Sequence, residues 1–177
     1  MVDSPLIAFY RGSGRDAAGR SLAQILAWDD GRLERVHDYI QWLFPLDAPS
    51  AFNPLAPVLT PADIAAFRRD PQLRERLHES LRRMLQFYGL TCDDARAIRI
   101  EPSARFGVRA TNWLTPGNHN HLRLTRILRS LHLLGLDDHA QALLDCLEAI
   151  ATENPGAIKA TTLAYWRRAA GGSGPGL

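Results

Sequence analysis

Helix start signals recur along this chain, each just before a run of apolar residues spaced three and four apart. Ser21 followed by Gln24 has the pattern of a capping box. Asp29 can cap a second helix with apolar residues as far as Phe44, and Pro45 ends that helix. This spacing places apolar side chains on one helix face. Five further helices are expected to begin near Thr60, Asp70, Asn118, Asp137 and Asn154.

No segment alternates β-branched and polar residues as a half-buried strand does, and Ile98 to Ile100 comes nearest. Residues 91–116 follow no sustained period and are expected to be mostly loop. The sequence therefore predicts an all-α fold, a compact array of about six to eight helices. We expect a single domain over residues 1–170 and a flexible tail over residues 171–177, GGSGPGL.

A long loop interrupts the helical pattern between Pro45 and Thr60. Its four prolines exclude a helix. The loop also carries apolar side chains, which favour an ordered loop held to the body of the protein by burial: Phe52, Leu55, Val58 and Leu59.

Composition excludes several classes of protein. Among 177 residues there are two cysteines, too few for a disulfide scaffold, and a net charge of +2, too small to indicate a polyanionic partner. No apolar run is long enough to span a membrane, and the N-terminus lacks a signal-peptide pattern, so a cytoplasmic location is expected. All basic residues except Lys159 are arginine, which favours a bacterial source. Acidic residues dilute the arginines between Arg68 and Arg96, so nucleic-acid binding is not expected.

No motif for catalysis is recognisable. The chain lacks a GxSxG elbow, a phosphate loop and a catalytic cysteine signature. His119 and His121 lie two apart, but no acidic or cysteine pair completes a metal site around them. The sequence favours a protein that is not an enzyme and needs no cofactor or metal.

One candidate site lies on the helix expected after Asp29. On a continuous helix, Leu33, Ile40 and Phe44 form the core face, and Trp42 falls opposite with Asp38 beside it. Trp42 then either packs against a second layer of protein, which is the favoured interpretation, or forms the wall of a ligand groove. Tyr39 has a polar end that suits both alternatives.

A second candidate site follows Asn118. His119, Arg123, Arg126 and Ser130 recur at spacings of four, three and four, which gives one polar stripe. Two guanidinium groups near a helix N-terminus can receive a carboxylate or a phosphate. The alternative is a solvated helix face whose arginines pair with carboxylates elsewhere in the chain.

Several blocks of sequence resemble one known family. His37 to Pro45 (HDYIQWLFP), followed by Ser50, Phe52-Asn53 and Ala56-Pro57, is similar to the conserved domain of the opioid growth factor receptor family. Three other blocks agree, in the family's order: Phe9 to Gly12, Met84 to Leu90, and the segment from His119 to Leu131. Together these blocks span roughly residues 6 to 150.

This resemblance implies a fold and a kind of function. Animal members of the family are nuclear-associated receptors for an opioid peptide. The resemblance therefore implies a binding domain for a peptide or a small anionic ligand, and it is compatible with a protein partner. The predicted groove is lined by eight residues: Asp38, Tyr39, Trp42, Asn53, His119, Asn120, Arg123 and Arg126. Two alternatives remain, an enzyme that uses a His/Asn/Arg/Asp cluster and a purely structural or oligomerising domain.

Overall fold

The computed structural model describes residues 3–172. Most of the predicted tail, from residue 173 on, lies outside the described residues. The chain divides into two compact units. The first holds the residues up to Arg83 together with Leu133–Gly135, and the second holds Met84–His132 and the residues from Leu136 on. A single domain over residues 1–170 stays a prediction.

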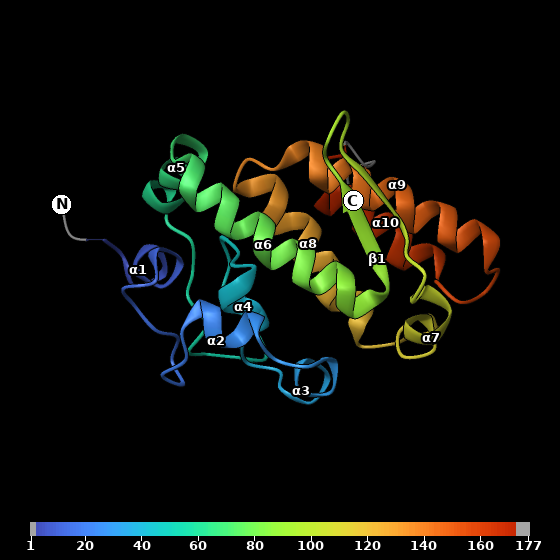
Figure 1. The fold of residues 1–177 in the computed structure, drawn as a ribbon, viewed down its shortest axis with the longest axis horizontal. Coiled ribbons are helices and arrows are strands. Elements are labelled where there is room, and N and C mark those ends of the chain that lie inside the picture. Colours follow the sequence, from blue (N-terminus) through green and yellow to red (C-terminus); the bar gives the residue numbers. More distant parts are fainter. Residues whose placement is uncertain (1–2, 173–177) are drawn as a thin grey trace. The chain divides into compact units, whose positions relative to one another are not determined.

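The first unit is helical. It contains five whole helices and most of a sixth: α1 (Pro5–Arg11), α2 (Leu22–Leu26), α3 (Asp30–Arg35), α4 (Ile40–Leu43), α5 (Pro61–Arg69) and α6 (Pro71–Tyr88) (Figure 1). The caps predicted at Ser21, Asp29 and Thr60 are confirmed. Ser21 with Gln24 and Thr60 with Asp63 form capping boxes, and the Asp29 carboxylate accepts the N–H of Arg32.

The single helix predicted from Asp29 to Phe44 is wrong, because the chain breaks between α3 and α4. Val36 is extended, at φ −94° and ψ 135°. The Tyr39 hydroxyl donates to the carbonyl of Leu33 at 3.0 Å, the oxygen that a continuous helix would offer to the N–H of residue 37. The break changes the register between Leu33 and Trp42, so Trp42 does not face away from the core.

Aromatic side chains fill the core of the first unit. Trp42 is 6% exposed and meets the ring of Phe9 edge-on, with 5.3 Å between centroids. Tyr10 packs on Phe67 in the same manner at 4.8 Å, and its hydroxyl donates to the carbonyl of Leu43. Burial raises the pKa of Tyr10. Packing is therefore the role that the structure gives the Trp42 side chain.

The Pro-rich loop is only partly held by burial. Leu59 is buried, and its N–H donates to the carbonyl of Leu46 at 2.9 Å. The prediction is wrong for Phe52, Leu55 and Val58, which are 86%, 74% and 43% exposed. Hydrogen bonds of Ser50 and Asn53 with backbone N–H groups order this part of the loop, where we expected buried side chains to do so.

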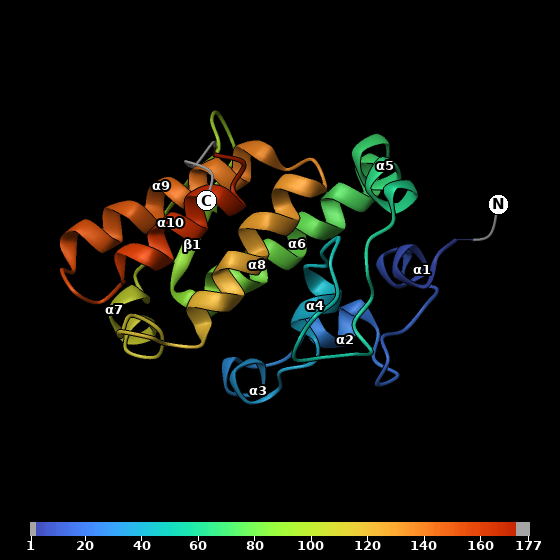
Figure 2. The same cartoon turned by 180° about the vertical axis from the view of Figure 1, so that it is seen from behind.

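The second unit contains the end of α6, a β-hairpin and four further helices: β1 (Leu90–Asp93), β2 (Arg99–Pro102), α7 (Phe106–Ala110), α8 (Asn120–Leu133), α9 (Asp137–Glu153) and α10 (Ala160–Ala169). The strands pair antiparallel with Cys92 opposite Ile100. β2 packs against α9, and α10 runs beside α9 (Figure 2). α9 begins at Asp137 instead of being capped by it, and the Asp137 carboxylate accepts from Nδ1 of His132 at 2.7 Å. The last helix, expected to begin near Asn154, begins at Ala160, because Asn154 ends α9.

The fold is mostly helical, as predicted. The described residues form ten helices, more than the six to eight expected, because several are short and one expected helix is two. Residues 91–116, expected to be mostly loop, also contain most of this hairpin and all of α7. Each strand buries only one side chain, Leu90 and Ile100, so no alternating pattern was readable. No helix of the described residues is long and apolar enough to cross a membrane.

Three hydrogen bonds to backbone carbonyls fix the core of the second unit. Nε1 of Trp113 donates to Tyr88, Nε2 of His121 donates to Trp113, and Nε1 of Trp166 donates to His121, at 3.0, 2.9 and 3.1 Å. These bonds join the end of α6, α8 and α10. All three side chains are buried, so each polar atom requires its carbonyl partner.

We expect Trp42→Ala to lower the free energy of unfolding by about 3–5 kcal/mol, because it removes a buried indole and leaves a cavity. Denaturant unfolding measures the change. Tyr165→Ala is the control, since Tyr165 is 59% exposed and should cost about 0.5 kcal/mol or less. A loss below about 1 kcal/mol for Trp42→Ala would contradict this packing role.

We expect the stability of the protein to fall as the pH drops below about 6.5. Burial, with a smaller effect of His119, lowers the pKa of His121 from its ordinary value of 6.5. The unfolded chain then binds a proton at a higher pH than the folded chain, so this part of the stability is present above about pH 6.5 and is lost as the pH falls through the folded pKa.

The variant His121→Gln separates the titration of His121 from that of the other histidines. The glutamine amide can still donate to the Trp113 carbonyl, but it does not titrate. Denaturant midpoints at pH 7.5 and 5.5 should differ less in the variant than in the wild type. Equal differences in both proteins would exclude His121 as the source.

Candidate functional site

The eight predicted ligand residues fall in both units. The first unit holds Asp38, Tyr39, Trp42 and Asn53, and the second holds His119, Asn120, Arg123 and Arg126. A groove that joins the two sets stays a prediction.

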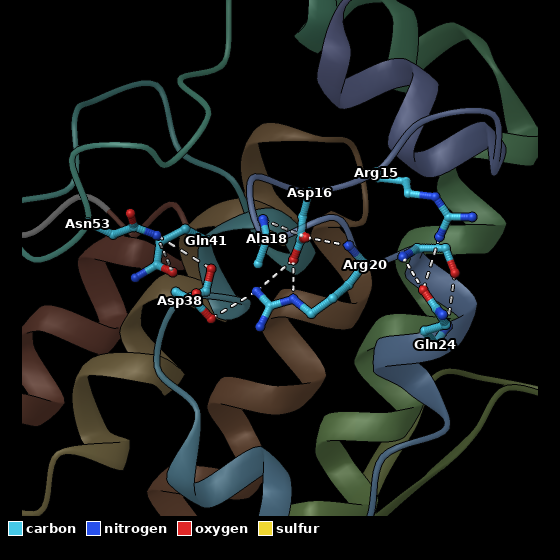
Figure 3. Close-up of polar contacts among 9 residues, drawn as sticks. Arg15, Asp16, Ala18, Arg20, Gln24, Asp38, Gln41 and Asn53 are labelled. Atoms are coloured by element: carbon cyan, nitrogen blue, oxygen red, sulfur yellow. Dashed lines mark hydrogen bonds and ion pairs between the residues drawn. The ribbon is translucent and has the colours of Figure 1, made fainter.

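Asp38 lies on the segment between α3 and α4 and forms an ion pair with Arg20 (Figure 3). Nη2 of Arg20 is 2.8 Å from the Asp38 carboxylate, and the same nitrogen is 2.6 Å from the carboxylate of Asp16. The Asp38 side chain is 52% exposed, whereas that of Asp16 is buried. A ligand that contacts the Asp38 carboxylate therefore contacts a group that is already paired with Arg20.

Sequence reasoning missed Asp16 and Arg20. The Asp16 carboxylate accepts the N–H groups of Ala18 and Arg20 at 3.0 and 2.8 Å, and Gly19 takes a φ of 77° in the same turn. The spacing of Asp16, Gly19 and Arg20 was the available signal for this turn. Burial alone would lower the pKa of Arg20, but its hydrogen bonds with Asp38 and Asp16 outweigh burial and raise it.

The ring of Trp28 packs against Arg20, the arginine that pairs with Asp16 and Asp38. The guanidinium carbons of Arg20 and Arg32 lie 5.2 and 4.3 Å from the centroid of its ring, as in cation–π contacts. Tyr39 meets the same indole edge-on at 5.5 Å and is fully buried. The role that the structure gives Tyr39 is therefore to hold the break between α3 and α4.

Asn53 ties the Pro-rich loop to the segment that carries Asp38. Its Nδ2 lies 3.4 Å from the Asp38 carbonyl and 3.5 Å from Oε1 of Gln41, at the outer limit for hydrogen bonds (Figure 3). Within the loop, the hydroxyl of Ser50 accepts the N–H of Asn53, and Oδ1 of Asn53 accepts the N–H of Leu55. Asp38 and Asn53 are therefore neighbours, while a shared role in ligand binding stays a prediction.

In the second unit, the N-terminus of α8 is capped by the chain itself. Oδ1 of Asn118 accepts the N–H of Asn120 at 3.0 Å, while Nδ2 of Asn118 donates to the Asn112 carbonyl and the Thr115 hydroxyl. An internal acceptor thus takes one of the N–H groups predicted to receive an anion. Recognition of an anion here would depend mainly on side chains.

Two of the four residues in the polar stripe of α8 are buried, Arg123 at 6% and Ser130 at 0% exposed, so a solvated helix face does not describe these two positions. His119 is exposed, and Asn120, which lies beside the stripe, is fully buried. Nη1 of Arg123 lies 3.4 Å from Oδ1 of Asn120. Burial lowers the pKa of Arg126. Two guanidinium groups one turn apart are therefore partly removed from water, and this strengthens their interaction with any oxygen ligand.

The two histidines at the start of α8 have different environments. His119 is exposed, whereas His121 is buried and its Nε2 donates to Trp113. Nε2 of His121 is therefore not available to a ligand or an ion beside His119.

Comparison with known proteins gives consistent matches. A family model described as the opioid growth factor receptor (OGFr) conserved region matches residues 18–171. The human opioid growth factor receptor is 39% identical over 144 residues, which are 79% of this chain and 21% of the human protein. The mouse receptor is 43% identical over 117 residues, which are 65% of this chain and 18% of that receptor.

Opioid growth factor receptor-like protein 1 of the rat is 33% identical over 146 residues, covering 78% of this chain and 30% of the rat protein. The chain therefore spans between 18% and 30% of the length of these relatives. No solved structure matches. Since the family model covers most of the chain and the relatives agree with it, this chain belongs to the opioid growth factor receptor conserved-region family.

Proposed function

We propose that this chain is a non-enzymatic binding domain that recognises a peptide through the Pro-rich loop and the neighbouring Asp38. The observation that carries the proposal is the exposure of Phe52 and Leu55, 86% and 74%, on a loop that hydrogen bonds hold in place. Large apolar side chains on a held loop offer binding energy without the cost of ordering the loop on binding.

The polar groups beside this loop suit a peptide ligand. The Asp38 carboxylate, half-exposed and anchored by Arg20, can accept a hydrogen bond from a peptide ammonium or a basic side chain. Asn53 places the loop next to the Asp38 carbonyl. The names of the relatives indicate one peptide class to test, an opioid growth factor, and the domain covers only part of those receptors.

A second candidate, recognition of a small anion, is favoured by the second unit. Arg123 is buried, burial lowers the pKa of Arg126, and guanidinium groups form their strongest hydrogen bonds with charged oxygen acceptors. His119 and Asn120 at the start of α8 are the polar groups predicted to complete this site.

The test uses peptides selected against the full chain from a phage-displayed random library. We expect these peptides to bind Phe52→Ser/Leu55→Ser at least about tenfold more weakly than the wild type, a loss of about 1.4 kcal/mol in binding free energy. The reason is that the variant removes both exposed apolar contacts while leaving the buried core intact. Isothermal titration calorimetry gives the affinities.

Val108→Ser is the matched control, because Val108 is also exposed, at 73%, but lies on α7. Selected peptides that bind both variants as well as the wild type would refute the role of the loop. Enkephalin added as a competitor shows whether opioid peptides share this surface.

Phosphate should stabilise the wild type but not Arg123→Met, if the arginines of α8 bind an anion. A ligand that binds only the folded chain raises the free energy of unfolding by RT ln(1 + [L]/Kd). The comparison uses the increment that phosphate gives to each protein in denaturant unfolding, so any loss of stability from the substitution itself cancels.

Arg168→Met, on the exposed side of α10, controls for general effects of charge. An equal phosphate increment in the wild type and in Arg123→Met would exclude Arg123 from an anion site.

A further inference from the structure

An open groove of about 530 Å³ lies in the second unit, and none of the eight predicted ligand residues lines it. Four of its lining residues come from one face of α9, at spacings of three, one and three: Asp138, Gln141, Ala142 and Asp145. The loop between β1 and β2 lines the opposite side with Asp94, Arg96, Ala97 and Ile98. The groove thus has a helix wall and a hairpin wall.

The lining combines negative charge with apolar surface. It holds three carboxylates and one guanidinium, and its apolar part comes from Ala97, Ile98 and Ala142. Nε2 of Gln141 donates to the Asp145 carboxylate at 2.7 Å and orients it. Lysine and arginine side chains have this complementary character, with an apolar stem and a cationic end.

The spacing of the carboxylates on α9 does not suit one metal ion. Asp138 and Asp145 are seven residues apart, about 10 Å along the helix axis at 1.5 Å per residue, whereas calcium ligands lie about 2.3–2.6 Å from the ion. Two basic side chains three residues apart in a polyproline II segment are about 9 Å apart on one face. The two aspartates therefore match a pair of basic side chains.

Two further acidic residues act on a buried thiol of α9. Cys146, next to Asp145 on α9, is buried. Burial, and then the charges of Glu101 and Glu153, raise the pKa of its thiol to about 12. Both glutamates lie outside the groove lining, Glu101 on β2 and Glu153 at the end of α9.

We propose that this groove binds an extended basic segment of a partner protein, with two arginines three residues apart that place their stems on Ala97, Ile98 and Ala142 and their guanidinium groups at Asp138 and Asp145. The site lies in a different unit from the Pro-rich loop. It therefore gives the domain a second binding surface, independent of the peptide surface proposed above.

Fluorescence anisotropy tests the proposal with a labelled peptide of sequence Arg-Pro-Ala-Arg-Pro-Ala and the full chain. We expect saturable binding that weakens with salt, because charges on an open surface are screened. Binding should be at least about tenfold weaker for Asp138→Asn/Asp145→Asn. The same peptide with citrulline at both arginines keeps the shape but not the charge, and it should not bind.

Glu75→Gln/Glu79→Gln removes the same two charges from exposed residues of α6 that do not line the groove, and it should bind like the wild type. Ala142→Arg fills the groove and should also abolish binding. Equal binding of the citrulline peptide, or unchanged binding by Asp138→Asn/Asp145→Asn, would overturn the proposal. Phe52→Ser/Leu55→Ser should keep this binding, so failure of the loop proposal and failure of this one are distinguishable.

Discussion

The hydrogen bond from the Tyr39 hydroxyl to the Leu33 carbonyl determines how the first unit presents its polar groups. It occupies a carbonyl that a continuous helix would use, and the chain breaks between α3 and α4. Because of this break, Trp42 enters the core against Phe9, while Asp38 stays half-exposed and reaches Arg20. On a straight helix, Asp38 and Trp42 would lie on the same face, away from the core.

Local chemistry explains which elements could be predicted. Caps such as Ser21, Asp29 and Thr60 act within three residues, so they are readable in the sequence and the structure confirms them. The break after Val36 depends on a buried tyrosine that must first be placed by the fold. The hairpin was missed for a related reason: Leu90 and Ile100 alone are buried, and one buried residue per strand gives no period.

In the candidate site, too, only the local features could be predicted from the sequence. The Asp16 turn is local, with Gly19 and Arg20 close by in sequence, and could have been found from their spacing. The pairing of Arg20 with Asp38 spans 18 residues and required the structure. The burial of Arg123 likewise could not be read from the polar stripe, because spacing on a helix defines a face but not what covers that face.

The binding role that we propose for the domain rests on the surfaces that these contacts leave exposed. In the first unit the guanidinium of Arg20 is already paired with the carboxylates of Asp16 and Asp38. What the first unit leaves exposed is apolar, at Phe52 and Leu55, and what the groove of the second unit exposes is mainly acidic. Apolar contact and charge complementarity are the means by which proteins recognise chains, and they require no chemical step.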